Sequence, residues 1–68
     1  MSLTLHLNGQ RTTLENARTI RDLLAQLGLE DKRIAVERNG EIVPKSSHAN
    51  TLLAEGDQIE IITAVGGG

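Results

Sequence analysis

The chain ends in three glycines, Gly66, Gly67 and Gly68, directly after the mainly apolar residues 59–65. A glycine tail has no Cβ atoms, so it can lie extended in a narrow channel. It also leaves the carboxylate of Gly68 without side-chain shielding. The five residues 64–68, fully extended, reach about 17 Å. That length is enough to carry a carboxylate into a partner's buried active site. A frayed terminus or a flexible linker is the opposing interpretation, and the tail alone fits both.

A carboxylate becomes an acyl donor only after activation, because oxide is a poor leaving group. Transfer of AMP from ATP onto the carboxylate of Gly68 gives a mixed anhydride that a sulfur or amine nucleophile attacks. This chemistry needs an unhindered terminal carbonyl with a thin segment behind it, and Gly66 and Gly67 provide both. The tail therefore predicts a protein substrate for an activating enzyme, with Gly68 as the reacting residue.

The other chemically capable side chains do not form a convincing active site. His48 follows two serines, but no orienting carboxylate or oxyanion donor pair accompanies them, so we interpret these residues as polar loop. We expect His6 on the solvated face of a strand, and Glu55 and Asp57 as solvated turn residues. Cysteine is absent, which excludes a thiolate nucleophile and a cysteine metal site. We expect a chain that is not an enzyme by itself.

Composition narrows the class of protein further. The 68 residues suit one domain, near the lower size limit for a core without staples. Phe, Tyr and Trp are absent, so Leu, Ile, Val and Ala must build the core, and nucleic acid bases find no aromatic platform. The net charge of −2 also argues against nucleic acid. Without a signal peptide or an apolar span, we expect a cytoplasmic domain, monomeric when free, that binds no metal, cofactor or membrane.

Local signals predict the elements that carry the tail. Asn-Gly pairs at residues 8–9 and 39–40 predict two β-hairpins, because a type I′ turn needs positive φ at both central residues. Thr19 and Asp22 resemble a capping box at the start of a helix, and Gly28 suits its end. The expected ranges are strands 3–7, 10–14, 33–38, 41–43 and 58–64, a helix 20–27, a polar loop 45–50 and a short helical turn 51–53.

This order of elements predicts an α+β domain of the ubiquitin-like β-grasp class. A hairpin, a helix and a second hairpin close most simply as a mixed sheet of four to five strands with one helix across one face. The last strand then lies in the middle of the sheet, parallel to the first. We expect the β-grasp domain over residues 1–63 and a flexible Gly-rich tail over residues 64–68. The expected core consists of Leu5, Leu23, Leu24, Leu27, Val36 and Ile61.

One sheet face is predicted to hold a docking surface. The last strand alternates until Ile62, which falls on the face opposite the core together with Glu60. Of Ile42 and Val43, one must also point away from the helix. A sheet covered by one helix leaves its second face open, so these apolar side chains would be exposed there. We predict that Ile62, Ile42 and Val43, with Val65 beside the tail, bind a partner. Scattered exposed aliphatic residues are the alternative.

Three segments stand out when they are read in order along the chain. They are Leu-Asn-Gly at residues 7–9, Ala-Val-Glu-Arg-Asn-Gly-Glu-Ile-Val-Pro at residues 35–44, and Gly-Asp-Gln-Ile-Glu-Ile at residues 56–61, followed by Val65 and the three glycines. Together they resemble the ThiS family, the sulfur-carrier proteins of thiamine biosynthesis with a ubiquitin-like β-grasp fold. The resemblance covers essentially the whole chain. Lys45 stands where the family often has arginine, and three glycines end the chain where two suffice.

The resemblance implies a mechanism at Gly68. An E1-like adenylating enzyme of the ThiF type, using ATP and magnesium, forms an acyl-adenylate there. A persulfide donor enzyme then converts the adenylate into a thiocarboxylate, and a thiazole synthase of the ThiG type takes the sulfur. Three other functions stay open: the small subunit of molybdopterin synthase, whose relatives tend to be longer and to carry aromatic residues; a protein modifier joined through Gly68 to lysines; and an interaction module with an incidental tail.

Overall fold

The computed structural model describes residues 2–63, so the predicted flexible tail at residues 64–68 lies outside the described residues. The elements in chain order are β1 (Ser2–Leu7), β2 (Gln10–Glu15), α1 (Ile20–Leu27), β3 (Ile34–Arg38), β4 (Glu41–Val43), the 3-10 helix η1 (Lys45–Ser47) and β5 (Gln58–Thr63).

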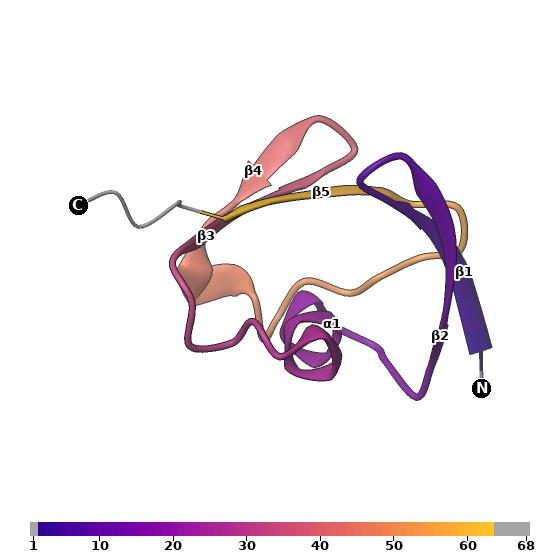
Figure 1. Cartoon of the computed structure of the whole chain (residues 1–68), viewed down its shortest axis with the longest axis horizontal. Coiled ribbons are helices and arrows are strands. Elements are labelled where there is room, and N and C mark those ends of the chain that lie inside the picture. The colour runs from indigo at the N-terminus through magenta and orange to yellow at the C-terminus, as the bar shows by residue number, and fades with distance from the viewer. Residues whose placement is uncertain (1, 64–68) are drawn as a thin grey trace.

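The five strands form one mixed sheet in the order β2-β1-β5-β3-β4. β5 runs parallel to β1 and antiparallel to β3, so the last strand lies in the middle of the sheet as predicted. The helix α1 packs across one face, and no other described element covers the opposite face (Figure 1). The segment that leads into the glycines is therefore held by strands on both sides at its beginning.

Both predicted hairpin turns are confirmed by their backbone angles. Asn8 and Gly9 have φ of 51° and 82°, and Asn39 and Gly40 have φ of 52° and 85°. Positive φ at both central residues is the type I′ conformation, whose twist matches that of the flanking strands. The hairpin registers follow directly, with Leu7 opposite Gln10 in the first.

The helix has the predicted bounds, and its first turn is closed by the predicted capping box. The Thr19 hydroxyl oxygen accepts from the Asp22 N–H at 3.1 Å. The Asp22 carboxylate in turn accepts from the backbone N–H groups of Arg18 and Thr19 at 2.9 and 3.1 Å. These two backbone donors, Arg18 first, hold the pKa of Asp22 below its usual value of 3.8.

Gly28 ends the helix with φ of 71°, and Leu29 folds back onto it. The Leu29 N–H donates to the Leu24 carbonyl at 2.8 Å, and the Gly28 N–H donates to the Ala25 carbonyl at 3.1 Å. These two bonds define a Schellman motif, in which the residue after the glycine packs against the last helical turn. Leu29 therefore lies against the core, and Leu27 is 39% exposed, so the prediction of a buried Leu27 was wrong.

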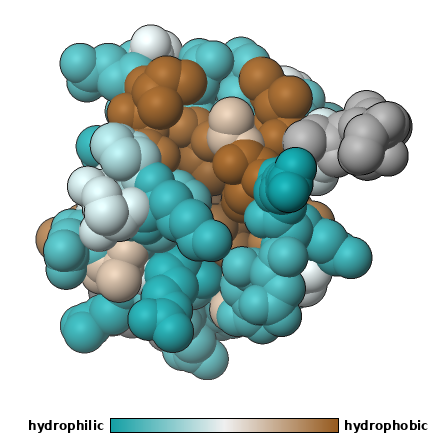
Figure 2. Space-filling view, turned by 90° about the vertical axis from the view of Figure 1, so that its left-hand side faces the viewer, coloured by the Kyte–Doolittle hydropathy of each residue, from teal (hydrophilic) through white to brown (hydrophobic). Residues whose placement is uncertain are grey.

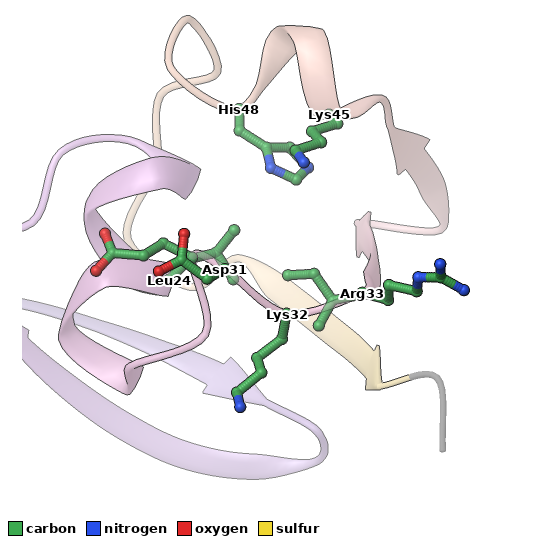
Figure 3. A pocket seen from close by; sticks show the side chains of 8 residues that line it. Leu24, Asp31, Lys32, Arg33, Lys45 and His48 are labelled. Atoms are coloured by element: carbon green, nitrogen blue, oxygen red, sulfur yellow. The ribbon is translucent and has the colours of Figure 1, made fainter. Parts of the chain in front are cut away.

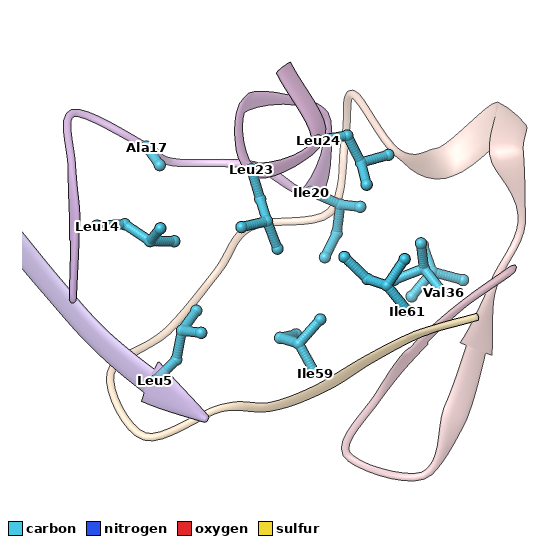
Figure 4. Packing of buried hydrophobic residues seen from close by; sticks show 10 residues of the cluster. Leu5, Leu14, Ala17, Ile20, Leu23, Leu24, Val36, Ile59 and Ile61 are labelled. Carbon is cyan, nitrogen blue, oxygen red and sulfur yellow. The ribbon is translucent and has the colours of Figure 1, made fainter. Parts of the chain in front are cut away.

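The core lies between α1 and the sheet and contains only aliphatic side chains (Figure 4). Five of the six predicted core residues are buried, and only Leu27 is not. The buried set is Leu5, Leu14, Ala17, Ile20, Leu23, Leu24, Val36, Val43, Ile59 and Ile61.

The segment between β4 and β5 differs from its prediction. The helical turn lies at Lys45–Ser47, directly after Pro44, and not at residues 51–53. Pro44 has φ of −60°, which suits the residue before a helical turn. Leu52 instead makes an isolated antiparallel bridge with Thr19 and is 66% exposed. This bridge ties the segment to the start of α1.

Candidate functional site

The predicted reacting residue and its neighbours follow directly after β5. Gly68, Gly67, Gly66 and Val65 lie outside the described residues, and Thr63 is the last residue that the structure describes. Along β5 the side chains alternate as predicted as far as Ile62, with Ile59 and Ile61 buried and Gln58, Glu60 and Ile62 exposed. The strand that carries the tail is thus anchored in the core.

The two turn asparagines tie β5 to the neighbouring hairpins. The Asn8 N–H donates to the Ile59 carbonyl at 2.8 Å. The Asn8 side-chain oxygen accepts from the Ile61 N–H at 2.8 Å. On the opposite side, the Asn39 N–H donates to the Gln58 carbonyl at 2.8 Å, and its side-chain oxygen accepts from the Gln58 N–H at 2.9 Å. In each turn the asparagine thus adopts the required positive φ, and its side chain also adds a hydrogen bond to β5.

Asp57, immediately before β5, is buried, so the prediction of a solvated turn residue was wrong for it. Its side chain is 5% exposed. It accepts from Arg38 Nε at 2.7 Å, from Arg38 Nη2 at 3.3 Å, from Asn39 Nδ2 at 3.1 Å and from the Ala54 N–H at 2.8 Å. Glu55 is exposed, as expected. The carboxylate joins the end of β3, the second turn and the start of β5.

The surroundings of Asp57 act on its pKa in opposite directions. Burial raises the pKa, because a charge is costly to remove from water. The Arg38 guanidinium and the donors from Ala54 and Asn39 act the other way and outweigh burial, so the pKa lies below its usual value of 3.8. The ion pair with Arg38 is the charged part of this network, and the Arg38 side chain is 32% exposed.

The structure exposes two of the three described side chains that were predicted to bind a partner. Ile42 and Ile62 are 64% and 55% exposed, whereas Val43 is 9% exposed and belongs to the core. The prediction that Val43 binds a partner is therefore corrected, because Val43 stands opposite the buried Val36 on the core side of β3 and β4. Hydrophobic side chains gather in the upper half of the molecule in Figure 2, on the side opposite α1.

Two carboxylates share the uncovered face with these isoleucines. Glu37 of β3 stands opposite Ile42 of β4 and opposite Glu60 of β5. The next outward residue of β5, Ile62, stands opposite Ala35. The face beside the end of β5 is therefore apolar and negatively charged.

His48 has a structural role that its sequence context did not reveal. The residue is 9% exposed, and its Nε2 lies 3.2 Å from the Val43 carbonyl oxygen, so the histidine joins the segment after η1 to β4. His48 lines a cavity of about 310 Å³ together with Leu24 and Asp31 (Figure 3). Acidic and basic residues both line this cavity, so it does not concentrate charge of one sign. His6 is half-buried on β1.

Comparison with known proteins identifies the family. The sequence model described as the ThiS family matches residues 5–68, which includes the three glycines. The chain belongs to the ThiS family. A relative from Bacillus subtilis named sulfur carrier protein ThiS is 45% identical over 65 residues, which cover 94% of this chain and 98% of that protein.

Two other relatives are larger proteins. A thiazole synthase from Paramagnetospirillum magneticum is 42% identical over 66 residues, and one from Magnetococcus marinus is 38% identical over 66 residues. Each alignment covers 97% of this chain but 20% of the relative, so the chain spans about one fifth of the length of these proteins. A stretch similar to this ThiS-family chain is therefore part of both thiazole synthases.

A solved structure confirms the predicted fold class. The crystal structure of the thiamine biosynthesis protein (ThiS) from Geobacter metallireducens matches with a TM-score of 0.80 at 29% identity, covering 97% of this chain and 100% of that one. The ubiquitin-like β-grasp fold is thus shared with a ThiS protein. Within residues 2–63 no helix is long and apolar enough to cross a membrane, and no three His, Cys, Asp or Glu side chains are grouped to hold a metal ion.

Proposed function

We propose that this chain is a sulfur carrier of thiamine biosynthesis and that the carboxylate of Gly68 carries the sulfur as a thiocarboxylate. The observation that carries the proposal is the match to the ThiS family from residue 5 through the glycines to residue 68. The similarity to the Bacillus subtilis sulfur carrier over nearly the full length of both chains supports it.

The geometry of the described residues suits this role. β5 is held by β1 and β3, by both turn asparagines and by two buried isoleucines, so the position of Thr63 is fixed relative to the core. The five residues that follow reach about 17 Å when fully extended. A folded domain of this kind delivers one carboxylate into a narrow site, while the domain itself stays at the mouth of that site. Gly66 and Gly67 let the tail thread through.

The proposed reaction takes place on enzymes that bind the carrier. A carboxylate oxygen of Gly68 attacks the α-phosphate of ATP on a ThiF-type adenylating enzyme, which supplies magnesium, and pyrophosphate leaves. A persulfide sulfur from a donor enzyme then attacks the carbonyl carbon, and AMP leaves. A thiol then attacks the donor enzyme's sulfur in the resulting acyl disulfide, so the S–S bond breaks, the thiocarboxylate leaves, and the thiol and the donor cysteine form a disulfide. A ThiG-type thiazole synthase then accepts the sulfur. We place these reactions in the cytoplasm. The carrier supplies the reacting carboxylate and binds no cofactor of its own.

The exposed face beside β5 is the proposed docking surface. Ile42 and Ile62 are large apolar side chains in contact with water, and they lie near the end of the strand that leads to the tail. Burial of such residues is a common source of binding energy at protein interfaces. The ThiS-like stretch within two thiazole synthases supports an enzyme of that class as one partner.

Pyrophosphate exchange tests the proposal. The purified chain, its adenylating enzyme, Mg-ATP and labelled pyrophosphate should give labelled ATP, because adenylation of Gly68 is reversible. The control variant lacks Gly67 and Gly68, and it should fold normally but support no exchange. Exchange that persists in the truncated chain would place adenylation elsewhere and contradict the proposal. Stable conjugates with lysines of other proteins would instead identify a protein modifier.

A further inference from the structure

The two sides of β5 are paired to different lengths. On one side β3 accompanies the strand as far as Thr63, which stands opposite Ile34. On the other side β1 pairs only with Gln58 and Ile59, because the chain then turns away at Asn8. β5 continues past the β1–β2 hairpin toward the C-terminal end, where residues 2–63 place no strand on that side (Figure 1). The last part of β5 therefore has an unpaired edge on its β1 side, although β5 is a central strand of the sheet.

The hydrogen bonds of the two asparagines show which backbone groups face this edge. Asn8 bonds with the Ile59 carbonyl and the Ile61 N–H, so the odd-numbered residues of β5 direct their backbone groups toward β1. Asn39 bonds with Gln58, so the even-numbered residues face β3. Because this alternation continues along a strand, the Ile61 carbonyl and the N–H and carbonyl of Thr63 face the open edge. Among the described residues these three groups have no hydrogen-bond partner.

We propose that this open edge, from the Ile61 carbonyl to Thr63, binds an extended segment of the adenylating enzyme by β-strand addition. The inference rests on the proposed function and specifies how the enzyme holds the carrier. Strand addition uses unpaired backbone groups of an exposed edge, and alternate side chains of the added strand supply specificity. The added segment would place a side chain beside Ile62, which is 55% exposed, so an apolar residue is expected there.

Two observations favour this occupant. The edge is continuous with the exposed surface around Ile62 and lies directly before the tail, so the same enzyme segment contacts the domain and orients residues 64–68. Orientation matters because a displacement of about 1 Å at a reacting group can cost about a hundredfold in rate. Symmetric pairing of this edge with the same edge of a second copy would use only these three backbone groups from each chain, because Asn8 occupies the edge further back. Such a short edge is a poor basis for a dimer.

The position of Thr63 allows a backbone test. The Thr63 N–H faces the open edge and not β3, so Thr63→Pro removes one donor from the edge and leaves the β3 pairing intact. Proline also favours extended backbone at the preceding residue, which Ile62 already has. Thr63→Ala is the matched variant that shortens the side chain but keeps the N–H. Calorimetric titration into the adenylating enzyme should show that Thr63→Pro binds about 5-fold to 30-fold more weakly than Thr63→Ala.

Amide hydrogen exchange by NMR provides a second measurement on the unaltered chain. In the free protein the Thr63 amide should exchange much faster than the Ile62 amide, which faces β3. In the complex the Thr63 amide should become protected. Equal affinity of the two variants, or a Thr63 amide that stays unprotected in the complex, would overturn the proposal. If the unaltered chain does not bind the enzyme at all, the proposed function fails and this inference fails with it.

Discussion

Asp57→Asn should destabilise the protein strongly although it replaces a single oxygen atom. The two oxygens of Asp57 are well used, since one accepts from Arg38 Nε and the Ala54 N–H and the other from Arg38 Nη2 and Asn39 Nδ2. An asparagine can keep one pair of these bonds, but its amide group then faces two donors. It also removes the charge that Arg38 pairs with.

The size of the effect follows from these contacts. Hydrogen bonds to charged groups contribute about 1.5–3 kcal/mol each. Each bond from Arg38 should contribute near the lower end of this range, because the Arg38 side chain is partly exposed and water weakens the ion pair. We therefore expect the free energy of unfolding at neutral pH to fall by about 2–3 kcal/mol. For a small domain with a total of about 5–15 kcal/mol, this is a large fraction.

The effect should depend on pH in a defined direction. The pKa of folded Asp57 lies below the usual value of 3.8, so the unfolded chain binds the proton more readily. The stabilisation from Asp57 is therefore complete above about pH 5 and is lost as the pH falls through 3.8 toward the folded-state pKa. The difference between the unaltered chain and Asp57→Asn should narrow over that range.

Urea melts at neutral and acidic pH measure this directly. Glu55→Gln is the matched control, because Glu55 is exposed and its Oε1 accepts one hydrogen bond, from the Thr4 N–H at 3.0 Å. That control should change the free energy of unfolding by less than about 0.5 kcal/mol. If Asp57→Asn is equally mild at neutral pH, or if its effect does not shrink in acid, the account of the Asp57 network is wrong.

Two further predictions concern the core and the docking surface. Leu23→Ala should lower the free energy of unfolding by about 2–5 kcal/mol, because it leaves a cavity in an aliphatic core. Leu27→Ala should lower it by less than about 1 kcal/mol. Similar losses for the two variants in urea melts would contradict the assigned core. Ile62→Glu should leave the circular dichroism spectrum and the melt unchanged but weaken binding of the adenylating enzyme or thiazole synthase by about tenfold or more. Thr13→Glu adds the same charge to the same sheet face on β2, and the docking assignment fails if both variants bind alike.

Much of the fold could be predicted because its signals are local. Each Asn-Gly pair determines a turn through the backbone angles of two adjacent residues. The capping box of Thr19 and Asp22 and the glycine at position 28 mark the helix ends in the same way. Alternation along the strands then assigns Ile59 and Ile61 to the core. Each of these inferences depends only on residues that are close together in the sequence.

The features that the sequence did not reveal depend on contacts between distant residues. Asp57 reads as a turn residue until the fold places it beside Arg38, which is 19 residues away. Val43 and Ile42 are chemically similar, and only the register with β3 shows which one is buried. Leu27 has the helical spacing of a core residue, but Leu29 covers the core after the Schellman turn. The role proposed for the glycines is chemical, and they lie outside the described residues.

The intact mass of the chain after sulfur transfer tests the central claim most directly. The purified protein is incubated with the adenylating enzyme, Mg-ATP and a sulfide or persulfide source, and then measured whole and after proteolysis. The account predicts a single increase equal to the mass of one sulfur minus one oxygen, confined to the peptide that contains Gly68. An unchanged mass, or a modification on any other residue, would contradict it.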